Sequence, residues 1–192
     1  MRVIYKKYLP DEEIPAVDYF SRRKLVKYFT RETMAAIVSI GELLNGTRPS
    51  PDTPFYFSGG ETEMMDLYKE ACMVFDSGVV KFDSSLFLEK ALPVISPLSH
   101  FKMMRNMAHC FISIEYGLKG DNAAVMGSVS GLLVPAMLSS GSGEILIGAG
   151  KLHANGTAEA GFALVRAQEL KTHPMLESDR EAICFFRENC NI

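Results

Sequence analysis

The sequence has no long hydrophobic run. It contains no uncharged apolar stretch of about 18 residues, whereas a transmembrane helix needs about 20. The N-terminus, MRVIYKKYLPDEE, lacks the apolar core of a secretory signal peptide. These absences argue against a membrane protein and predict that the chain is cytoplasmic.

The sequence also has no large excess of one charge and few cysteines. It contains 20 Lys and Arg against 23 Asp and Glu, for a net charge of -3, so nothing favours binding to nucleic acid or to an anionic membrane. The cysteines stand singly, with no CxxC pair, which argues against a zinc site or a disulfide framework. We therefore expect no metal and no cofactor. We expect buried thiols at Cys72, Cys110, Cys184 and Cys190.

What the chain does contain is alternating strand and helix patterns in one domain of 192 residues, 47% of them hydrophobic. Apolar runs bounded by turns predict strands at 2–8, 55–57, 122–127, 143–149 and 159–167. Helical periodicity predicts helices from Ser21 to Asn45-Gly46 and at 61–77, 84–91, 99–116, 131–140 and 177–190. The order βαβαβαββ plus a terminal helix predicts an α/β fold with a mostly parallel five-stranded sheet covered by helices.

The most informative segment runs from residue 105 to 151. It predicts a helix, a Gly-Leu-Lys-Gly turn, a strand that ends in small residues, a short helix and a second apolar strand. A strand that turns at once into a helix exposes one side chain at the bend, where an acyl-transfer nucleophile would lie. Ser128 is the candidate nucleophile. The bend, called the elbow below, comprises Gly127, Ser128, Val129, Ser130 and Gly131.

This segment resembles the N-terminal half of the β-ketoacyl synthases of the thiolase superfamily. Further similarity covers the first long helix, FYFSGGETE and EAGFALVRAQE, so nearly the whole chain aligns with that half. The resemblance implies a thiolase-like half domain over residues 1–192, with residues 171–192 as a C-terminal helical extension, in fatty-acid or polyketide-type metabolism. The matching elbow-region residues are Asn106, Met107, Tyr116, Gly117, Leu118, Gly120, Ser130 and Gly131.

Departures from the family pattern imply that condensing activity is absent. The family carries an acylated Cys at the elbow, whereas the equivalent position here is Ser128 or Val129, depending on the direction of counting. The chain also ends before the second half, which supplies two His and a Lys in the family. The loop that walls the family's acyl pocket is reduced to KLHANGTA, with a turn at Asn155-Gly156. We expect a non-condensing companion, or a subunit that binds an acyl group or a carrier protein.

Two alternatives stay open. In the first, Ser128 or a displaced Cys110 performs acyl transfer or thioester hydrolysis, which requires a nearby base such as His109 or His153. In the second, the protein is purely a structural oligomeric scaffold.

A dense basic run is a candidate docking site. Arg22, Arg23, Lys24 and Lys27, followed by Arg31, stand at the start of the first predicted helix, where positive charge opposes the helix dipole. Because acyl carrier proteins are acidic, electrostatic steering would bring one to this patch.

Apolar surface predicts that the protein is not a monomer. The segment NAAVMGSV supplies an uncharged strand edge, and a contiguous apolar patch on a free surface is rare in monomers. We expect a homo-oligomer or a heteromer with a full-length ketosynthase. The side chains expected on the uncovered surfaces are Phe101, Met104, Ile112, Leu133 and Met137.

Overall fold

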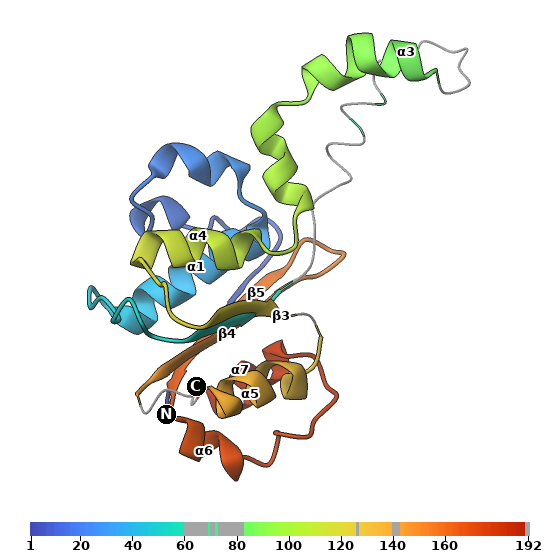
Figure 1. The fold of residues 1–192 in the computed structure, drawn as a ribbon. Helices are drawn as coiled ribbons and strands as arrows, with labels where there is room; N and C mark the ends of the chain where they lie inside the picture. The colour runs from blue at the N-terminus through green and yellow to red at the C-terminus, as the bar shows by residue number, and fades with distance from the viewer. Residues whose placement is uncertain (60–68, 70–71, 73–82, 126, 140–142, 191–192) are drawn as a thin grey trace.

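One mixed sheet forms the centre of the computed structural model, which describes residues 1–59, 69, 72, 83–125, 127–139 and 143–190 (Figure 1). The strand order is β1-β5-β4-β2-β3. β2 pairs in parallel with β3 and β4, whereas β5 runs antiparallel to β1 and β4. The predicted α/β class and five strands are confirmed, but the sheet is mixed because β5 turns straight back along β4. The strands are β1 (Arg2–Tyr8), β2 (Phe55–Ser58), β3 (Asn122–Val125), β4 (Ile145–Leu152) and β5 (Ala158–Val165).

The predicted Asn-Gly turn joins β4 to β5. Gly156 has a φ of +86°, a conformation that glycine adopts without steric cost. The His153 amide donates to the Thr157 carbonyl at 2.8 Å and closes the hairpin. The turn therefore fixes the register of two central strands.

Helices α1 (Arg31–Leu44) and α4 (Met107–Tyr116) cover one face of the sheet (Figure 1). Phe55 and Phe57 of β2 and Phe162 of β5 are buried in this layer. α1 ends as predicted, because Asn45 adopts the left-handed conformation with φ of +44°.

Helices α5 (Val129–Leu138), α6 (Ala167–Lys171) and α7 (Ile183–Asn189) cover the opposite face (Figure 1). Phe185 and Phe186 of α7 are buried there. A Cβ atom on Gly161 of β5 would lie 2.3 Å from the Phe186 Cβ. Glycine at this position therefore allows α7 to approach the sheet closely.

The predicted helix that begins at Ser21 is wrong. Two separate elements occupy this region: a 3-10 helix, η2 (Arg23–Tyr28), and α1, whose N-cap is Thr30. Thr30 Oγ1 accepts a hydrogen bond from the Thr33 amide at 3.1 Å. Ser21 instead donates to Glu115 of α4 at 2.8 Å. Arg22, Arg23, Lys24 and Lys27 therefore lie on or beside η2, and only Arg31 lies at the positive end of α1.

Other predicted boundaries also move. The region 97–116 forms a 3-10 helix, η5 (Pro97–Met103), and then α4, because Met104 is extended between them. α5 begins two residues before its predicted start, and Pro135 lies inside the helix. The predicted terminal helix at 177–190 shortens to α7, and α6 was not predicted.

The segment before η5 departs from the body of the molecule. The predicted helix at 84–91 is present as α3 (Ser84–Leu86) followed by a π-helical turn, η3 (Phe87–Ala91), and this part projects away from the sheet (Figure 1). A short 3-10 turn, η4 (Leu92–Val94), leads to η5. The predicted helix at 61–77 lies outside the described residues, apart from residues 69 and 72.

The expectation of exposed apolar side chains holds only in part. β3 is an edge strand of the sheet, and Met104 is 44% exposed. Ile112 and Leu133 are fully buried in the two layers of this chain, so their prediction as uncovered surface is wrong. Phe101 and Met137 are half-buried. Of the cysteines predicted to be buried, Cys184 is buried, whereas Cys72, Cys110 and Cys190 are half-buried.

Candidate functional site

The elbow connects β3 to α5. Gly127 has a φ of +118°, which an L side chain rarely adopts, and Ser128 is the N-cap of α5. Ser128 Oγ accepts a hydrogen bond from the Gly131 amide at 3.2 Å and lies 2.8 Å from Ser130 Oγ. The predicted nucleophile therefore caps the helix.

The C-terminal segment, residues 178–182, lies along the elbow as a short antiparallel bridge. It occupies the backbone groups that begin α5, which are the donors that would stabilise an oxyanion at the bend. The helix start is thus satisfied within the chain. The hydrogen bonds run from the Val129 amide to the Arg180 carbonyl (2.7 Å), from the Ser130 amide to the Ser178 carbonyl (3.0 Å) and from the Ala182 amide to the Gly127 carbonyl (3.3 Å).

The elbow lies where two parallel strands send the chain to opposite faces of the sheet. Among the described elements, α4, which lies between β2 and β3 in the sequence, covers the α1 face, whereas α5, which lies between β3 and β4, covers the other face. Crevices at such switch points, outside the carboxyl ends of the strands, are the usual ligand sites of open α/β sheets.

A cavity of about 330 Å³ occupies this crevice and is called the switch-point cavity. Its volume is at the low end of the range for small-molecule sites. Ser58 and Ser128 are among the polar residues that line it, so it suits a small polar group. The lining residues are Ser58, Gly59, Arg105, Gly127, Ser128, Gly150, Lys151, Asp179, Glu181, Ala182 and Ile183.

The charges of the cavity are balanced. Lys151 of β4 projects into it, and its Nζ lies 2.6 Å from Glu181 Oε1. Arg105 and Asp179, which also line it, add one further charge of each sign. A cavity with two cations and two carboxylates has no net preference for an anion or a cation.

Neither histidine that was considered as a base for Ser128 lines this cavity. His109 is buried in the α1 layer, with its ring stacked 4.8 Å from that of Phe55, and burial lowers its pKa. His153 directs Nε2 to Glu159 at 2.8 Å. Within the described residues the cavity therefore brings no imidazole to Ser128.

Cys110 also lies apart from the elbow. It is half-buried on α4, where burial raises the pKa of its thiol. A raised pKa reduces the fraction of thiolate, the nucleophilic form. Asn106 Nδ2 donates a hydrogen bond to its Sγ at 3.7 Å, but the net shift of the thiol pKa is upward, so the described structure does not favour the Cys110 alternative.

A carboxylate that the sequence analysis did not single out lies behind the cavity. Glu32, in the first turn of α1, is 2% exposed. A Cβ atom on Gly59 or on Gly150 would lie 2.4 Å or 2.6 Å from Glu32 Oε1. Both glycines line the cavity, so their missing side chains leave the space that this carboxylate occupies.

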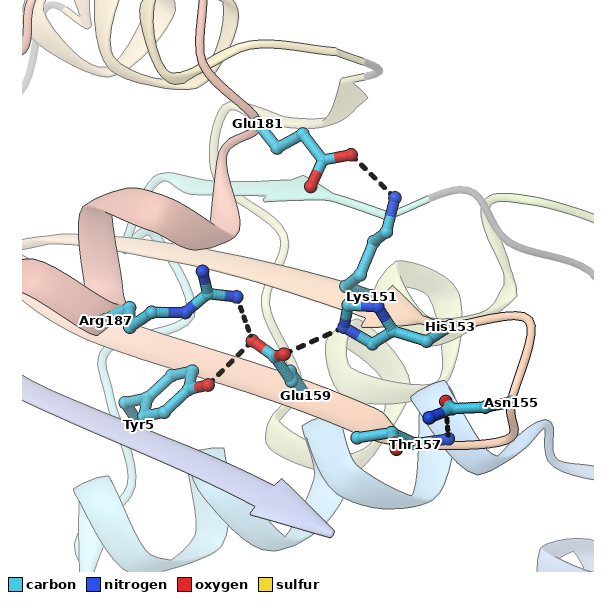
Figure 2. A network of polar contacts seen from close by, with 8 residues as sticks. All are labelled: Tyr5, Lys151, His153, Asn155, Thr157, Glu159, Glu181 and Arg187. Atoms are coloured by element: carbon cyan, nitrogen blue, oxygen red, sulfur yellow. Dashed lines mark hydrogen bonds and ion pairs between the residues drawn. The ribbon is translucent and has the colours of Figure 1, made fainter. Parts of the chain in front are cut away.

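A second group that the sequence analysis missed is a polar network around Glu159 at the start of β5 (Figure 2). Its carboxylate accepts hydrogen bonds from the Tyr5 hydroxyl (2.7 Å), Arg187 Nη2 (2.6 Å) and His153 Nε2 (2.8 Å). The signal in the sequence is a single acidic residue within the apolar run AEAGFALV. Because the donors come from β1, the hairpin and α7, the network ties three elements together.

Burial shapes the protonation of this network. The Glu159 side chain is 3% exposed. Burial alone would raise its pKa, but the hydrogen bonds from Arg187, Tyr5 and His153 outweigh burial and hold the pKa below its ordinary value. Burial and the neighbouring Glu159 together raise the pKa of Tyr5 to about 12. The carboxylate is therefore ionised and the phenol neutral near pH 7.

The predicted docking residues Arg22, Arg23, Lys24 and Lys27 are all exposed on or beside η2. Arg31 has a different role. Its guanidinium donates to the carbonyls of residues 9, 12 and 156, at 2.6, 3.0 and 3.1 Å, and so anchors the start of α1 to two loops.

Comparison with known proteins gives no family. No protein-family model matches the chain, and no curated protein matches its sequence. In the described part of the chain, no three His, Cys, Asp or Glu side chains are grouped to hold a metal ion. None of the described helices is long and apolar enough to cross a membrane.

Proposed function

We propose that this protein is a β-ketoacyl-synthase-like subunit of fatty-acid or polyketide-type metabolism that does not condense acyl groups. It acts as a companion subunit, and a small polar part of a ligand enters the switch-point cavity. The resemblance in sequence motivates this proposal, and the order β1-α1-β2-α4-β3-α5-β4-β5 supports it, since it agrees with the order expected of a thiolase-like half.

The observation that carries the proposal is the occupied elbow. An acyl-transfer site needs a free nucleophile, a base and free donors for the oxyanion. Here Ser128 caps α5, the amides of Val129 and Ser130 donate to the C-terminal segment, and no His of the described residues lines the cavity. The polar groups of the elbow thus bind α5 and the C-terminal segment, which leaves them unavailable for catalysis.

The test is to incubate the protein with acyl- and malonyl-carrier protein and to measure carbon dioxide and product. We expect no release above that of a Ser128→Ala variant. A fluorophosphonate probe, followed by peptide mass spectrometry across residues 120–151, should leave Ser128 unmodified. Condensation above the variant, or a stoichiometric adduct on Ser128, would contradict the proposal.

One observation favours a second candidate, acyl transfer or hydrolysis by Ser128. Lys151 lines the same cavity, and serine–lysine pairs serve as nucleophile and base in some hydrolases. The ion pair with Glu181 opposes this, because it stabilises the protonated ammonium. Thioester hydrolysis that is lost in both Ser128→Ala and Lys151→Met would support this candidate.

The proposed companion role includes self-association or a heteromer with a full-length ketosynthase. β3 offers an unpaired edge within the described residues, and a free edge is normally covered in soluble proteins. The purely structural scaffold, the third reading of the sequence, would share this association but would bind nothing in the cavity.

A further inference from the structure

We propose that η2 and η5 form one basic docking face for an acidic, amphipathic protein surface, and that this face leads to the switch-point cavity. The sequence alone indicates only the part of this face that lies at η2. The basic face comprises Arg22, Arg23, Lys24, Lys27, His100, Lys102 and Arg105.

Packing in the fold joins two segments that lie about 75 positions apart in the sequence. η2 packs against η5. Val26 is buried, and the Phe101 ring meets that of Phe111 edge-on at 5.6 Å. Because these apolar side chains point inward, the basic side chains of both turns are exposed, apart from Lys102, which is half-buried.

The face carries charge of one sign. Residues 19–31 and 92–106 contain no Asp or Glu, although the whole chain has a net charge of -3. In the part of the chain that the structure describes, no ion pair is formed by Arg22, Arg23, Lys24 or Lys27. The bordering carboxylate of Glu115 is held by Ser21. Clustered like charges repel, so an acidic partner would gain attraction at this face.

The face ends at the cavity. Arg105 follows η5 after one extended residue, Met104, and it lines the switch-point cavity. A partner seated on η2 and η5 would therefore have its edge at the mouth of the cavity. This continuity distinguishes the face from a solvated charge run.

The apolar part of the face indicates a protein as the partner. Leu98, Met103 and Met104, each 37–44% exposed, alternate with the basic side chains of η5. Protein interfaces combine apolar contacts with a polar rim. Single-stranded nucleic acid and membrane interfaces favour exposed aromatic side chains, but Tyr28 and Phe101 are half-buried here.

The inference rests on the proposed function only for the identity of the partner, since carrier proteins of that metabolism are acidic. The face itself is defined by residues and packing that do not depend on the resemblance. Two probes separate these claims: poly-L-glutamate tests the face, and an apo acyl carrier protein tests the identity.

The decisive variant is Arg23→Glu with Lys24→Glu. The matched control is Lys119→Glu with Lys171→Glu, which makes the same change in net charge at two exposed sites outside the face. Circular dichroism verifies that both variants are folded. Binding of each probe is measured at low and at physiological salt, together with binding to phosphatidylglycerol vesicles.

We expect both probes to bind the wild type and the control, with association that weakens at higher salt. The Arg23/Lys24 variant should lose about tenfold or more in affinity, because each reversal places like charges together. Equal binding by the variant and the control would contradict the proposed docking face. Vesicle binding that depends on Arg23 and Lys24, without such dependence for poly-L-glutamate, would also overturn it. Loss of poly-L-glutamate binding with no carrier binding at all would retain the face and contradict the carrier-binding part of the proposed function.

Discussion

Neutralising the buried Glu159 should lower the free energy of unfolding substantially, because three donors from three elements converge on its carboxylate (Figure 2). Glu159→Gln keeps the shape but removes the charge. Hydrogen bonds to a charged group contribute about 1.5–3 kcal/mol each, and breaking a buried ion pair costs about 3–5 kcal/mol. Arg187 is 44% exposed, so water can solvate it once the charge is gone. We expect the free energy of unfolding to fall by roughly 2–4 kcal/mol.

The reverse truncation should cost at least as much. Among the described residues, Arg187→Gln leaves the carboxylate of Glu159, which is 3% exposed, with Tyr5 and His153 as its remaining side-chain donors. Without its counter-ion, the buried carboxylate of Glu159 cannot be solvated by water. The Arg187 guanidinium, in contrast, can be solvated when Glu159 is neutralised. The asymmetry follows from the difference in exposure.

The loss of stability caused by Glu159→Gln should become smaller as the pH falls. The pKa of Glu159 is lower in the folded protein than its ordinary value, so the unfolded chain takes up a proton at higher pH than the folded chain does. The stabilisation is complete above the unfolded pKa of about 4.3 and is lost as the pH falls through the folded pKa. The difference between wild type and Glu159→Gln should therefore narrow below about pH 4.

Urea unfolding followed by circular dichroism, at pH 7 and at steps down to pH 3, measures these differences. Glu181→Gln is the matched control, because it removes a carboxylate that is 60% exposed and paired with Lys151. An exposed pair contributes less than about 1 kcal/mol. The reasoning fails if Glu159→Gln costs no more than Glu181→Gln, or if its cost stays constant to pH 3.

Three further outcomes are expected. Gly161→Ala should lower the free energy of unfolding in urea by about 1–3 kcal/mol, because its Cβ would meet Phe186 at 2.3 Å; an unchanged midpoint would show that α7 shifts freely. His109→Phe retains the stacking on Phe55 but cannot titrate; since burial lowers the pKa of His109, the wild type should lose stability as the pH falls below about 6.5, and the variant should lose less. Light scattering after size exclusion at micromolar concentration should give more than one chain for the wild type and a smaller mass for Val125→Lys on the β3 edge; a single-chain mass for both would contradict the association.

The sequence by itself determined the elements whose signals are local. The apolar runs at 2–8 and 55–57 became β1 and β2, Asn45 ended α1 and Asn155-Gly156 formed the hairpin turn. Each depends on the conformational preference of one or two residues and on burial of an adjacent apolar run. Neighbouring residues suffice to encode such features.

Helix starts were less predictable, because several residues compete to cap them. Both Ser21 and Thr30 can cap a helix, and the sequence does not distinguish them. Thr30 is the N-cap of α1, whereas Ser21 is hydrogen-bonded to Glu115 of α4, 94 positions away in the sequence. The basic run consequently lies on η2, beside η5.

Only the tertiary structure decided the site. The sequence identified Ser128 and the glycines of the elbow, but the bond of the Val129 amide to the Arg180 carbonyl joins segments far apart along the chain. The same holds for Glu159, whose donors Tyr5 and Arg187 come from opposite ends of the sequence. Composition and periodicity report which side chains are apolar and how they repeat, whereas the pairing of polar groups depends on which elements the folded sheet brings together. The role of Ser128 as a helix cap therefore emerged only with the fold.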